Sequence, residues 1–95
     1  MPKYLVERWV PGVSCLTAAE LSAIVDKSLA VLGDLGPGIR WVVSYVAGER
    51  MYCVYDAVDA ELVREHARRT GLPVDAVTPM AAVLGPGSLA PGPIG

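Results

Sequence analysis

The sequence lacks a hydrophobic run long enough to cross a membrane. Its richest apolar stretch, residues 39–47, is interrupted by Arg40 and is far shorter than the roughly 20 residues that a membrane-spanning helix needs. The N-terminus also lacks the apolar segment of a signal peptide, because Glu7 and Arg8 follow Lys3 at once. We therefore expect a cytoplasmic protein with no membrane partner.

A strong excess of one charge is lacking too, since eight Lys and Arg residues face ten Asp and Glu residues for a net charge of −2. The one basic group, Arg64 with Arg68 and Arg69, is too small to predict a nucleic-acid partner. Cys15 and Cys53 lie far apart and form no C-x-x-C motif. We expect both to be free thiols that pack as small apolar side chains.

Signatures of the common catalytic chemistries are missing. His66 is the only histidine, and no Ser–His–acid arrangement can be argued from it. The glycines in residues 33–38 lack the strand-to-helix context that a phosphate-binding loop requires. The sequence therefore carries no motif that names a reaction.

Apolar residues, by contrast, are abundant. They make up 53% of the 95-residue chain, and its mean hydropathy is +0.42. A domain this short buries only about 60–65% of the surface that its unfolded chain exposes. Some of the apolar surface is therefore expected to cover a ligand or a partner chain.

Four stretches rich in β-forming residues predict strands. Pro11-Gly12 ends the first of them, and Gly48-Glu49 predicts a tight hairpin between the second and the third. Pro79 favours an edge position for the last strand. The predicted strands are residues 3–10, 39–47, 50–57 and 77–84.

Helix-start signals follow the first and the third of these strands. Thr17 and Glu20 have the spacing of a capping box, and Asp59 fits an N-cap. Gly33 and Gly71 are typical helix ends. The first helix has an apolar stripe at spacings of three and four, formed by Leu21, Ile24, Val25, Leu29 and Leu32.

The order strand, helix, strand, strand, helix, strand predicts an α+β fold of ferredoxin-like βαββαβ type. Such a fold has a four-stranded antiparallel sheet with both helices on one face. The domain is expected to span residues 1–84, and the Gly- and Pro-rich residues 85–95 are expected to form a flexible tail.

Both faces of the predicted sheet are largely apolar, whereas a half-covered antiparallel sheet normally presents polar residues to water. We therefore expect a second copy to pack sheet against sheet about a two-fold axis, giving a homodimeric α+β barrel. In the second strand the alternation predicts one shared face for Ile39, Trp41, Val43 and Tyr45.

Several segments resemble a bacterial family of small ferredoxin-like proteins of unassigned function, some members of which are described as nickel-binding. The resemblance runs from about Met1 to Leu84, and it implies a ferredoxin-like dimer. Dimeric α+β barrels of similar build include cofactor-free monooxygenases, lactone isomerases and polyketide cyclases, an analogy of fold alone. The segments that carry the resemblance are MPKYLVER, LTAAEL, LGPGIRWVVSYV, RMYCVY and REHARRTGLP.

The resemblance implies nickel binding by this chain only in part. The relatives carry extra histidines at positions that correspond to residues 7–9 and 71–73, where this chain has none. His66 alone remains, and nickel favours imidazole nitrogen. A nickel site would therefore need His66 together with Glu7 or Glu65, or ligands from a second chain.

His66 is the side chain whose ordinary pKa lies nearest neutrality. We expect it at the edge of the second helix's inner stripe, as a general acid/base, as a metal ligand or as a solvated helix residue. Glu7 either pairs with Arg8 at a dimer rim or enters a pocket, where burial would suit it to proton transfer.

Aromatic side chains gather on the central strands, where they serve either as packing or as the wall of a ligand pocket. Arg64, Arg68 and Arg69 either form a solvated face with Glu61 and Glu65 or hold a small anion. The aromatic set is Trp9, Trp41, Tyr45, Tyr52 and Tyr55.

Together these features predict a homodimer that binds a small organic molecule between sheet and helices, without a cofactor. It could be a cofactor-independent isomerase or cyclase of secondary metabolism. Nickel binding through His66 and Glu7 is the alternative, and a dimeric scaffold without a site is the third outcome. The expected catalytic residues are His66, Glu7, Tyr45 and Tyr55, and the expected ligand-binding residues are Trp9, Trp41, Tyr52, Glu65 and Arg69.

Overall fold

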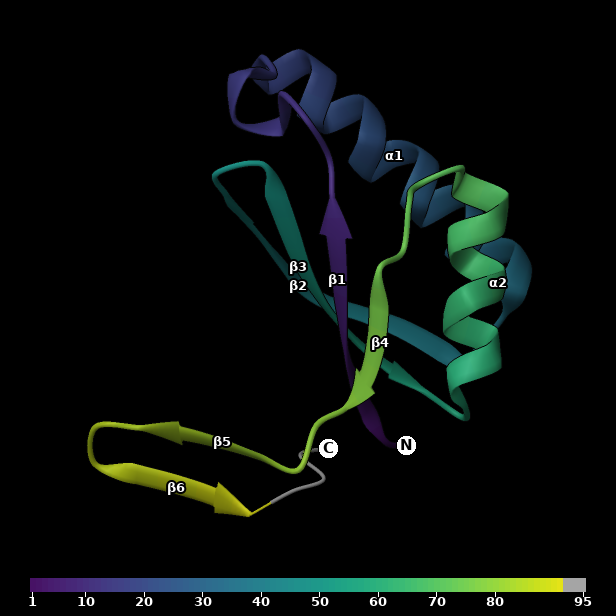
Figure 1. The fold of residues 1–95 in the computed structure, drawn as a ribbon. Coiled ribbons are helices and arrows are strands. Elements are labelled where there is room, and N and C mark those ends of the chain that lie inside the picture. The colour runs from purple at the N-terminus through teal and green to yellow at the C-terminus, as the bar shows by residue number, and fades with distance from the viewer. Residues whose placement is uncertain (92–95) are drawn as a thin grey trace.

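A computed structural model describes residues 1–91 of the chain, which fold into a sheet, two long helices and a separate hairpin (Figure 1). Among these residues no helix is both long and apolar enough to cross a membrane. In chain order the elements are β1 Lys3–Trp9, the short helical turn η1 Val13–Cys15, α1 Ala18–Leu35, β2 Ile39–Ala47, β3 Arg50–Ala57, α2 Ala60–Thr70, β4 Ala76–Pro79, β5 Ala82–Gly85 and β6 Ser88–Pro91.

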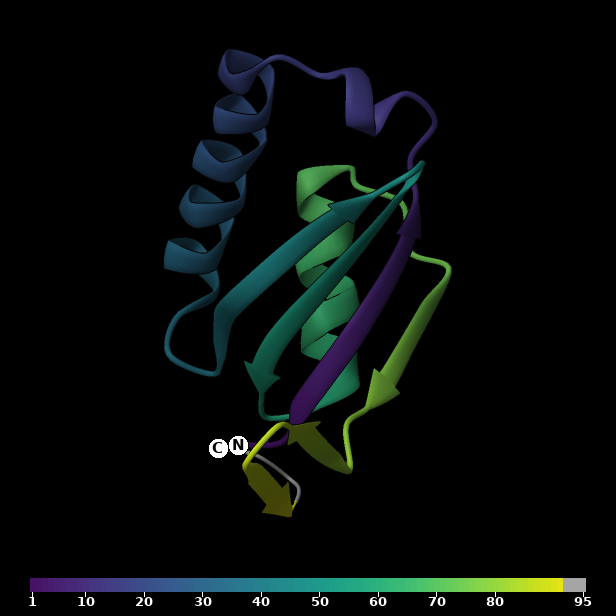
Figure 2. The ribbon, with the colours of Figure 1, turned by 90° about the vertical axis from the view of Figure 1, so that its left-hand side faces the viewer.

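The main sheet has the strand order β2-β3-β1-β4, and every neighbouring pair in it is antiparallel. Both helices lie on one side of this sheet, and Figure 2 views the other side, with α2 behind the strands. The arrangement confirms the predicted α+β, ferredoxin-like fold.

Both helices begin where the sequence indicates and α2 also ends there, whereas α1 continues through Gly33 to Leu35, with Gly36 as its C-cap. The Glu20 amide donates to Thr17 Oγ1 at 3.1 Å and Glu20 Oε1 accepts from the Thr17 amide at 3.0 Å, which completes the capping box. Asp59 Oδ1 accepts from the Leu62 amide at 2.8 Å at the start of α2. Gly71 ends α2 at a φ of +77°, in the left-handed region that glycine adopts without strain.

The hydrophobic core lies between the helices and the side of the sheet that faces them. Successive strand residues point to opposite faces, so the core takes every second residue of β1 and β3. Its buried members are Tyr4, Val6, Val13, Ile39, Met51, Cys53, Tyr55, Ala57 and Val63.

We call the opposite side of the sheet the open face, because no helix covers it (Figure 2). The register of the strands places seven of its side chains there: Leu5, Glu7, Trp9, Val43, Tyr45, Tyr52 and Val54. Trp9 and Tyr45 are 52% and 59% exposed. The open face is therefore rich in aromatic and aliphatic groups, as the sequence predicted.

The predicted alternation in β2 is wrong beyond Trp41. The register shifts between Trp41 and Val43, so Val42 is an extra residue in the ladder. Because a β-bulge reverses the faces that follow it, Ile39 and Trp41 point toward the helices, whereas Val43 and Tyr45 point to the open face.

The C-terminal part differs from the single strand predicted at residues 77–84. β4 ends at Pro79, and β5 then pairs with β6 in a hairpin whose turn contains Pro86 and Gly87. Gly87 has a φ of +73°, which favours glycine. The hairpin therefore takes in residues 85–91 of the predicted tail, and residues 92–95 lie outside the described part of the chain.

A buried carboxylate links strands β1 and β3, which are far apart in the sequence and adjacent in the sheet. Asp56 is 2% exposed; it accepts from Lys3 Nζ at 2.8 Å and also pairs with Arg40. Burial alone would raise the pKa of Asp56, but the hydrogen bonds and charges of Lys3 and Arg40 outweigh it and lower that pKa.

Asp56→Ala is expected to lower the free energy of unfolding by about 3–5 kcal/mol, because it leaves Lys3 buried without a counter-charge. Asp26→Ala, at an exposed position of α1, is the matched control and should stay within about 0.5 kcal/mol of wild type. Urea unfolding measures both values. Equal stability of the two variants would contradict the structural role of Asp56.

Candidate functional site

Four polar side chains meet in the core between the sheet and the helices, and we call them the buried polar cluster. They are Arg8 on β1, Ser28 on α1, Tyr55 on β3 and His66 on α2. Their exposed fractions are 0% for Arg8, 6% for Ser28, 2% for Tyr55 and 0% for His66. Perturbed polar groups that converge in a core are candidates for a functional site.

His66 joins α2 to α1 and to the sheet. Its Nε2 lies 2.9 Å from Ser28 Oγ, and its ring centroid lies 5.2 Å from that of Tyr55 at an interplanar angle of 54°. His66 Nδ1 is buried and has no hydrogen-bond partner within residues 1–91. A buried polar atom without a partner costs about 1–3 kcal/mol, so the unpaired Nδ1 of His66 requires an explanation.

Arg8 is the stronger anomaly. Its Nη1 donates to the Pro73 carbonyl at 2.8 Å, and its Nη2 lies 3.4 Å from the Tyr55 hydroxyl. Arg8 Nε has no partner, and within the described residues no carboxylate forms an ion pair with Arg8. A buried charge is normally paired, so Arg8 is a buried cation that lacks an anion.

Burial and the charge of Arg8 set the protonation of the cluster. Burial first, and the nearby Arg8 cation second, lower the pKa of His66 below 6.5. Burial and the proximity of Cys53 raise the pKa of Tyr55 above 10.0, although Arg8 acts in the opposite direction. At neutral pH, His66 is therefore uncharged, Tyr55 keeps its proton, and Arg8 carries the only charge of the cluster.

A surface hollow lies beside the segment that holds Arg8. It has a volume of about 300 Å³ and is lined by Arg64, Ala67, Arg68, Gly71, Leu72 and Val74. Pro73, whose carbonyl accepts from Arg8, lies between the last two lining residues. A larger hollow of about 510 Å³ includes Arg40 and Asp56, but these two groups already pair with each other.

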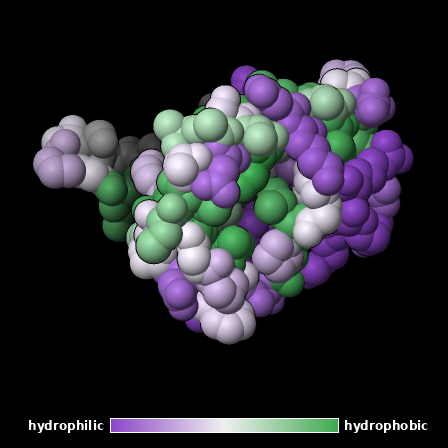
Figure 3. All heavy atoms as spheres, turned by 90° about the horizontal axis from the view of Figure 1, so that it is seen from above, coloured by the Kyte–Doolittle hydropathy of each residue, from purple (hydrophilic) through white to green (hydrophobic). Residues whose placement is uncertain are grey.

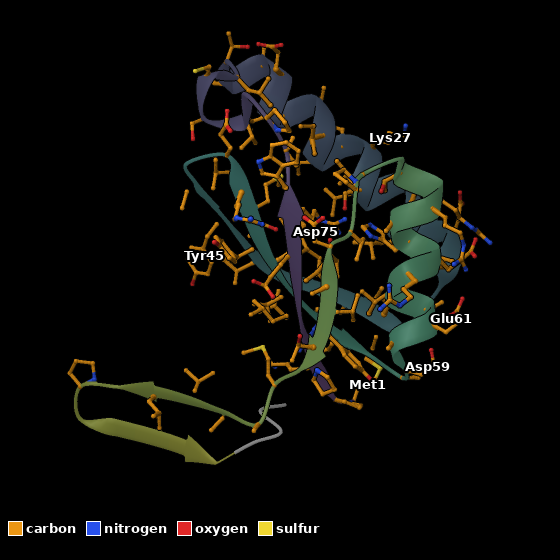
Figure 4. All side chains as sticks on the ribbon, in the orientation of Figure 1. Met1, Lys27, Tyr45, Asp59, Glu61 and Asp75 are labelled. Carbon is orange, nitrogen blue, oxygen red and sulfur yellow. The ribbon has the colours of Figure 1, made fainter. Side chains whose placement is uncertain are left out.

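The predicted site residues divide into three groups. His66 and Tyr55 lie in the buried polar cluster, and Trp41 lies on the same face of the sheet, where its Nε1 donates to Ser44 Oγ at 2.9 Å. The second group, on the open face, is Glu7, Trp9, Tyr45 and Tyr52. Tyr52 is the cross-strand partner of both Tyr45 and Glu7, and Figure 4 shows Tyr45 pointing away from the helices.

The third group lies on the outer surface of α2. Glu65 accepts from Arg68 Nη2 at 2.6 Å and from Arg69 Nε at 2.8 Å. These partners lower the pKa of Glu65, with Arg69 as the larger cause. The pairs match the solvated charged face that was one reading of the sequence, and they lie apart from the buried polar cluster.

Arg8 and Ser28 were not among the predicted site residues. Arg8 points into the core and Glu7 to the open face, so the Arg8–Glu7 pair that the sequence suggested does not form. The signal for Arg8 was its position between Val6 and Val10 on the apolar side of β1. Ser28 is buried on the inner side of α1, and no feature of the sequence indicated that this serine is buried.

Comparisons with known proteins agree on one family. The family model described as nickel responsive protein SCO4226-like matches residues 4–80. The crystal structure of SCO4226 from Streptomyces coelicolor A3(2) is similar to this chain with a TM-score of 0.63 and 19% identity, over 79% of this chain and 90% of that one. No curated protein matches the chain. At 19% identity the structural similarity supports a shared fold alone.

Within one copy of the chain, the described donors do not converge on a site for a nickel ion. Within the part of the chain that the structure describes, no three His, Cys, Asp or Glu side chains stand close enough to hold a metal. His66 Nε2 is engaged by Ser28, and the Arg8 cation beside it would repel a metal ion. Glu7 lies on the other side of the sheet, so it cannot join His66 within one chain.

The stability of the fold should depend on pH through His66. Its pKa is lower in the folded chain than in the unfolded chain, so the unfolded chain binds a proton that the folded chain excludes. Stability is therefore expected to fall as the pH drops below about 6.5, by at most about 1.4 kcal/mol per pH unit. Urea unfolding between pH 7.5 and pH 5 measures this slope.

His66→Asn is the comparison, because it removes the titrating group and the chain has no other histidine. The variant should be flat over the same range, whatever its absolute stability. A wild-type protein that is equally stable throughout, or a variant that keeps the wild-type slope, would contradict the assignment.

Proposed function

Because this chain belongs to the nickel responsive protein SCO4226-like family, we propose that it acts in a response to nickel as a homodimeric binding protein. Its ligand under this proposal is a small organic anion, such as a carboxylate, held between the sheet and the helices. Arg8 binds the anionic group, and Tyr55, Ser28 and His66 orient the rest of the ligand. The protein needs no resident cofactor for this role.

The observation that carries the proposal is the uncompensated charge of Arg8. A guanidinium that is 0% exposed has lost its hydration, and the neutral Pro73 carbonyl and Tyr55 hydroxyl replace only part of it. The free Arg8 Nε is a donor, and the free His66 Nδ1 is a donor or an acceptor, depending on the tautomer. An anion with a second polar group would satisfy both atoms.

A route to Arg8 is supported by the segment from Gly71 to Val74. It lies between Arg8 and the 300 Å³ hollow, and it joins α2 to β4 outside both elements. Connecting segments move more easily than the elements they join. Arg64 is exposed and lines this hollow, so it would attract an anion toward the cluster.

The homodimer is supported by the open face. Trp9 and Tyr45 are both more than half exposed there, and exposed aromatic patches of this kind favour an interface. Packing of two open faces would build the predicted α+β barrel and cover these side chains.

A cofactor-independent isomerase or cyclase reaction stays a prediction. Neutral His66 has the protonation state of a base, and it lies next to the Tyr55 ring and the Ser28 hydroxyl. The same four residues that would bind the anion would then act on it.

Direct nickel binding is a second candidate, supported by the name of the family. Titration calorimetry with NiCl₂ on wild type and on His66→Ala tests it. Nickel binding that His66→Ala abolishes would favour a metal site at His66 over the anion site. We expect no difference between the two proteins, because His66 is engaged by Ser28 beside a cation.

Arg8→Met should abolish binding of a small organic anion without unfolding the protein. Replacement of a buried charge by an apolar residue of similar size is often neutral or stabilising, so the melting temperature should equal or exceed that of wild type. Titration with sodium benzoate and with trisodium citrate, followed by ¹H–¹⁵N chemical shifts, measures binding. Shifts are expected at the buried polar cluster for at least one of the two anions.

Arg50→Met is the matched control, because Arg50 is exposed at the start of β3; it should keep both binding and stability. The proposal fails if neither anion shifts the cluster in wild type. It also fails if Arg8→Met lowers the free energy of unfolding by about 3 kcal/mol or more, since that loss marks a purely structural arginine.

A further inference from the structure

The β5–β6 hairpin, residues 82–91, is an addition to the family's domain, and we call it the arm. The family model matches residues 4–80 and so ends before the arm begins. β5 pairs only with β6, in a sheet separate from the main one. The arm therefore lies outside the part of the chain that the family match covers.

The arm is not stabilised by its own chain. Within the described residues, the strands of the arm pair only with each other, and no strand of the main sheet pairs with them. An isolated two-stranded hairpin is marginally stable at best in water. Leu84 is 74% exposed and Val83 is 44% exposed, so the arm presents apolar side chains that nothing in the described chain covers.

The arm projects on the side of the open face. In Figure 1 it extends to the left of the sheet while the helices lie to the right, and in Figure 2 it comes toward a viewer who faces the open face. Figure 3 shows it from above as a projection at the left of the body, with the strongly hydrophilic residues gathered at the right, on the helical side. Tyr45 points to the same side as the arm (Figure 4).

The chemistry of the arm matches the open face. Residues 81–95 contain no charged residue, and the open face presents the exposed rings of Trp9 and Tyr45 together with half-buried Leu5 and Val43. An uncharged apolar hairpin brings no charge of its own into a contact with these rings. The arm and the open face of one chain stand apart, so the contact has to come from another copy.

We propose that the arm of each chain packs on the open face of a second copy, so that two copies exchange arms about a two-fold axis. The exchange rests on the proposed homodimer, and it adds that the two exchanged arms hold the copies together. When two open faces pack against each other, each arm reaches the partner copy, because it projects beyond the open face of its own chain. The partner copy is the occupant that this geometry and this composition favour.

The test compares two variants of the whole chain at exposed leucines, one on the arm and one, Leu29, that belongs to the predicted apolar stripe of α1 but is exposed. Leu84→Lys places a charge on the arm, and Leu29→Lys places the same charge on the outside of α1, where Leu29 is 52% exposed. Analytical ultracentrifugation measures the dimer dissociation constant. Leu84→Lys should weaken the dimer about tenfold or more, and Leu29→Lys should leave it unchanged.

A second measurement locates the contact. In a mixture of ¹³C-labelled and unlabelled chains, isotope-filtered NOEs should join the Leu84 methyl groups of one chain to the rings of Tyr45 and Trp9 of the other. Equal dissociation constants for both variants, NOEs confined to one chain, or partition of the arm into phosphatidylcholine vesicles would each overturn the exchange. If Leu84→Lys leaves the dimer intact, the arm exchange is refuted but the homodimer is not. If the wild type is a monomer at 100 μM, the homodimer is refuted as well.

Discussion

The buried charge of Arg8, for which the described residues supply no carboxylate partner, is the constraint on which the proposed function depends. Arg8 lies at the end of β1, fully inside the core, and two neutral oxygens are its partners in the described chain. Burial first, and the field of Arg8 second, lower the pKa of His66 and keep it uncharged, and that field would repel a metal cation. The same field is what an anionic ligand would neutralise. Burial of the cation is a cost to folding that an apolar residue would not incur, so the proposed anion site, rather than stability, would account for Arg8.

The sheet divides the molecule into two surfaces of different chemistry. The side that faces the helices carries the core and the buried polar cluster, and the open face carries exposed aromatic rings. Glu7 and His66 belong to different sides, although both were predicted to share one site. Under the two proposals, ligand binding and assembly take opposite sides of one sheet, and the arm projects on the side proposed for assembly.

Periodicity and capping residues were sufficient to predict the main sheet and both helices, because Thr17, Asp59 and Gly71 give local signals that the structure uses directly. The bulge at Val42 escaped prediction, since no proline or glycine marks it, and it reversed the faces of Val43 and Tyr45. The burial of Arg8 escaped as well, because alternation places a residue on a face but does not reveal that the face is covered there. The break after Pro79 depends on pairing of β5 with β6, which a stretch of Ala, Val and Leu leaves open.

The central claim is that Arg8 is buried in order to hold an anion that the chain does not supply. A crystal structure at about 1.2 Å, from protein grown and purified without added organic acids, tests it most directly. The account predicts density for a non-protein anionic group against Arg8 Nε, with a polar atom directed at His66 Nδ1. A carboxylate of the protein itself turned onto Arg8, or close apolar packing around the guanidinium with no further group, would contradict it.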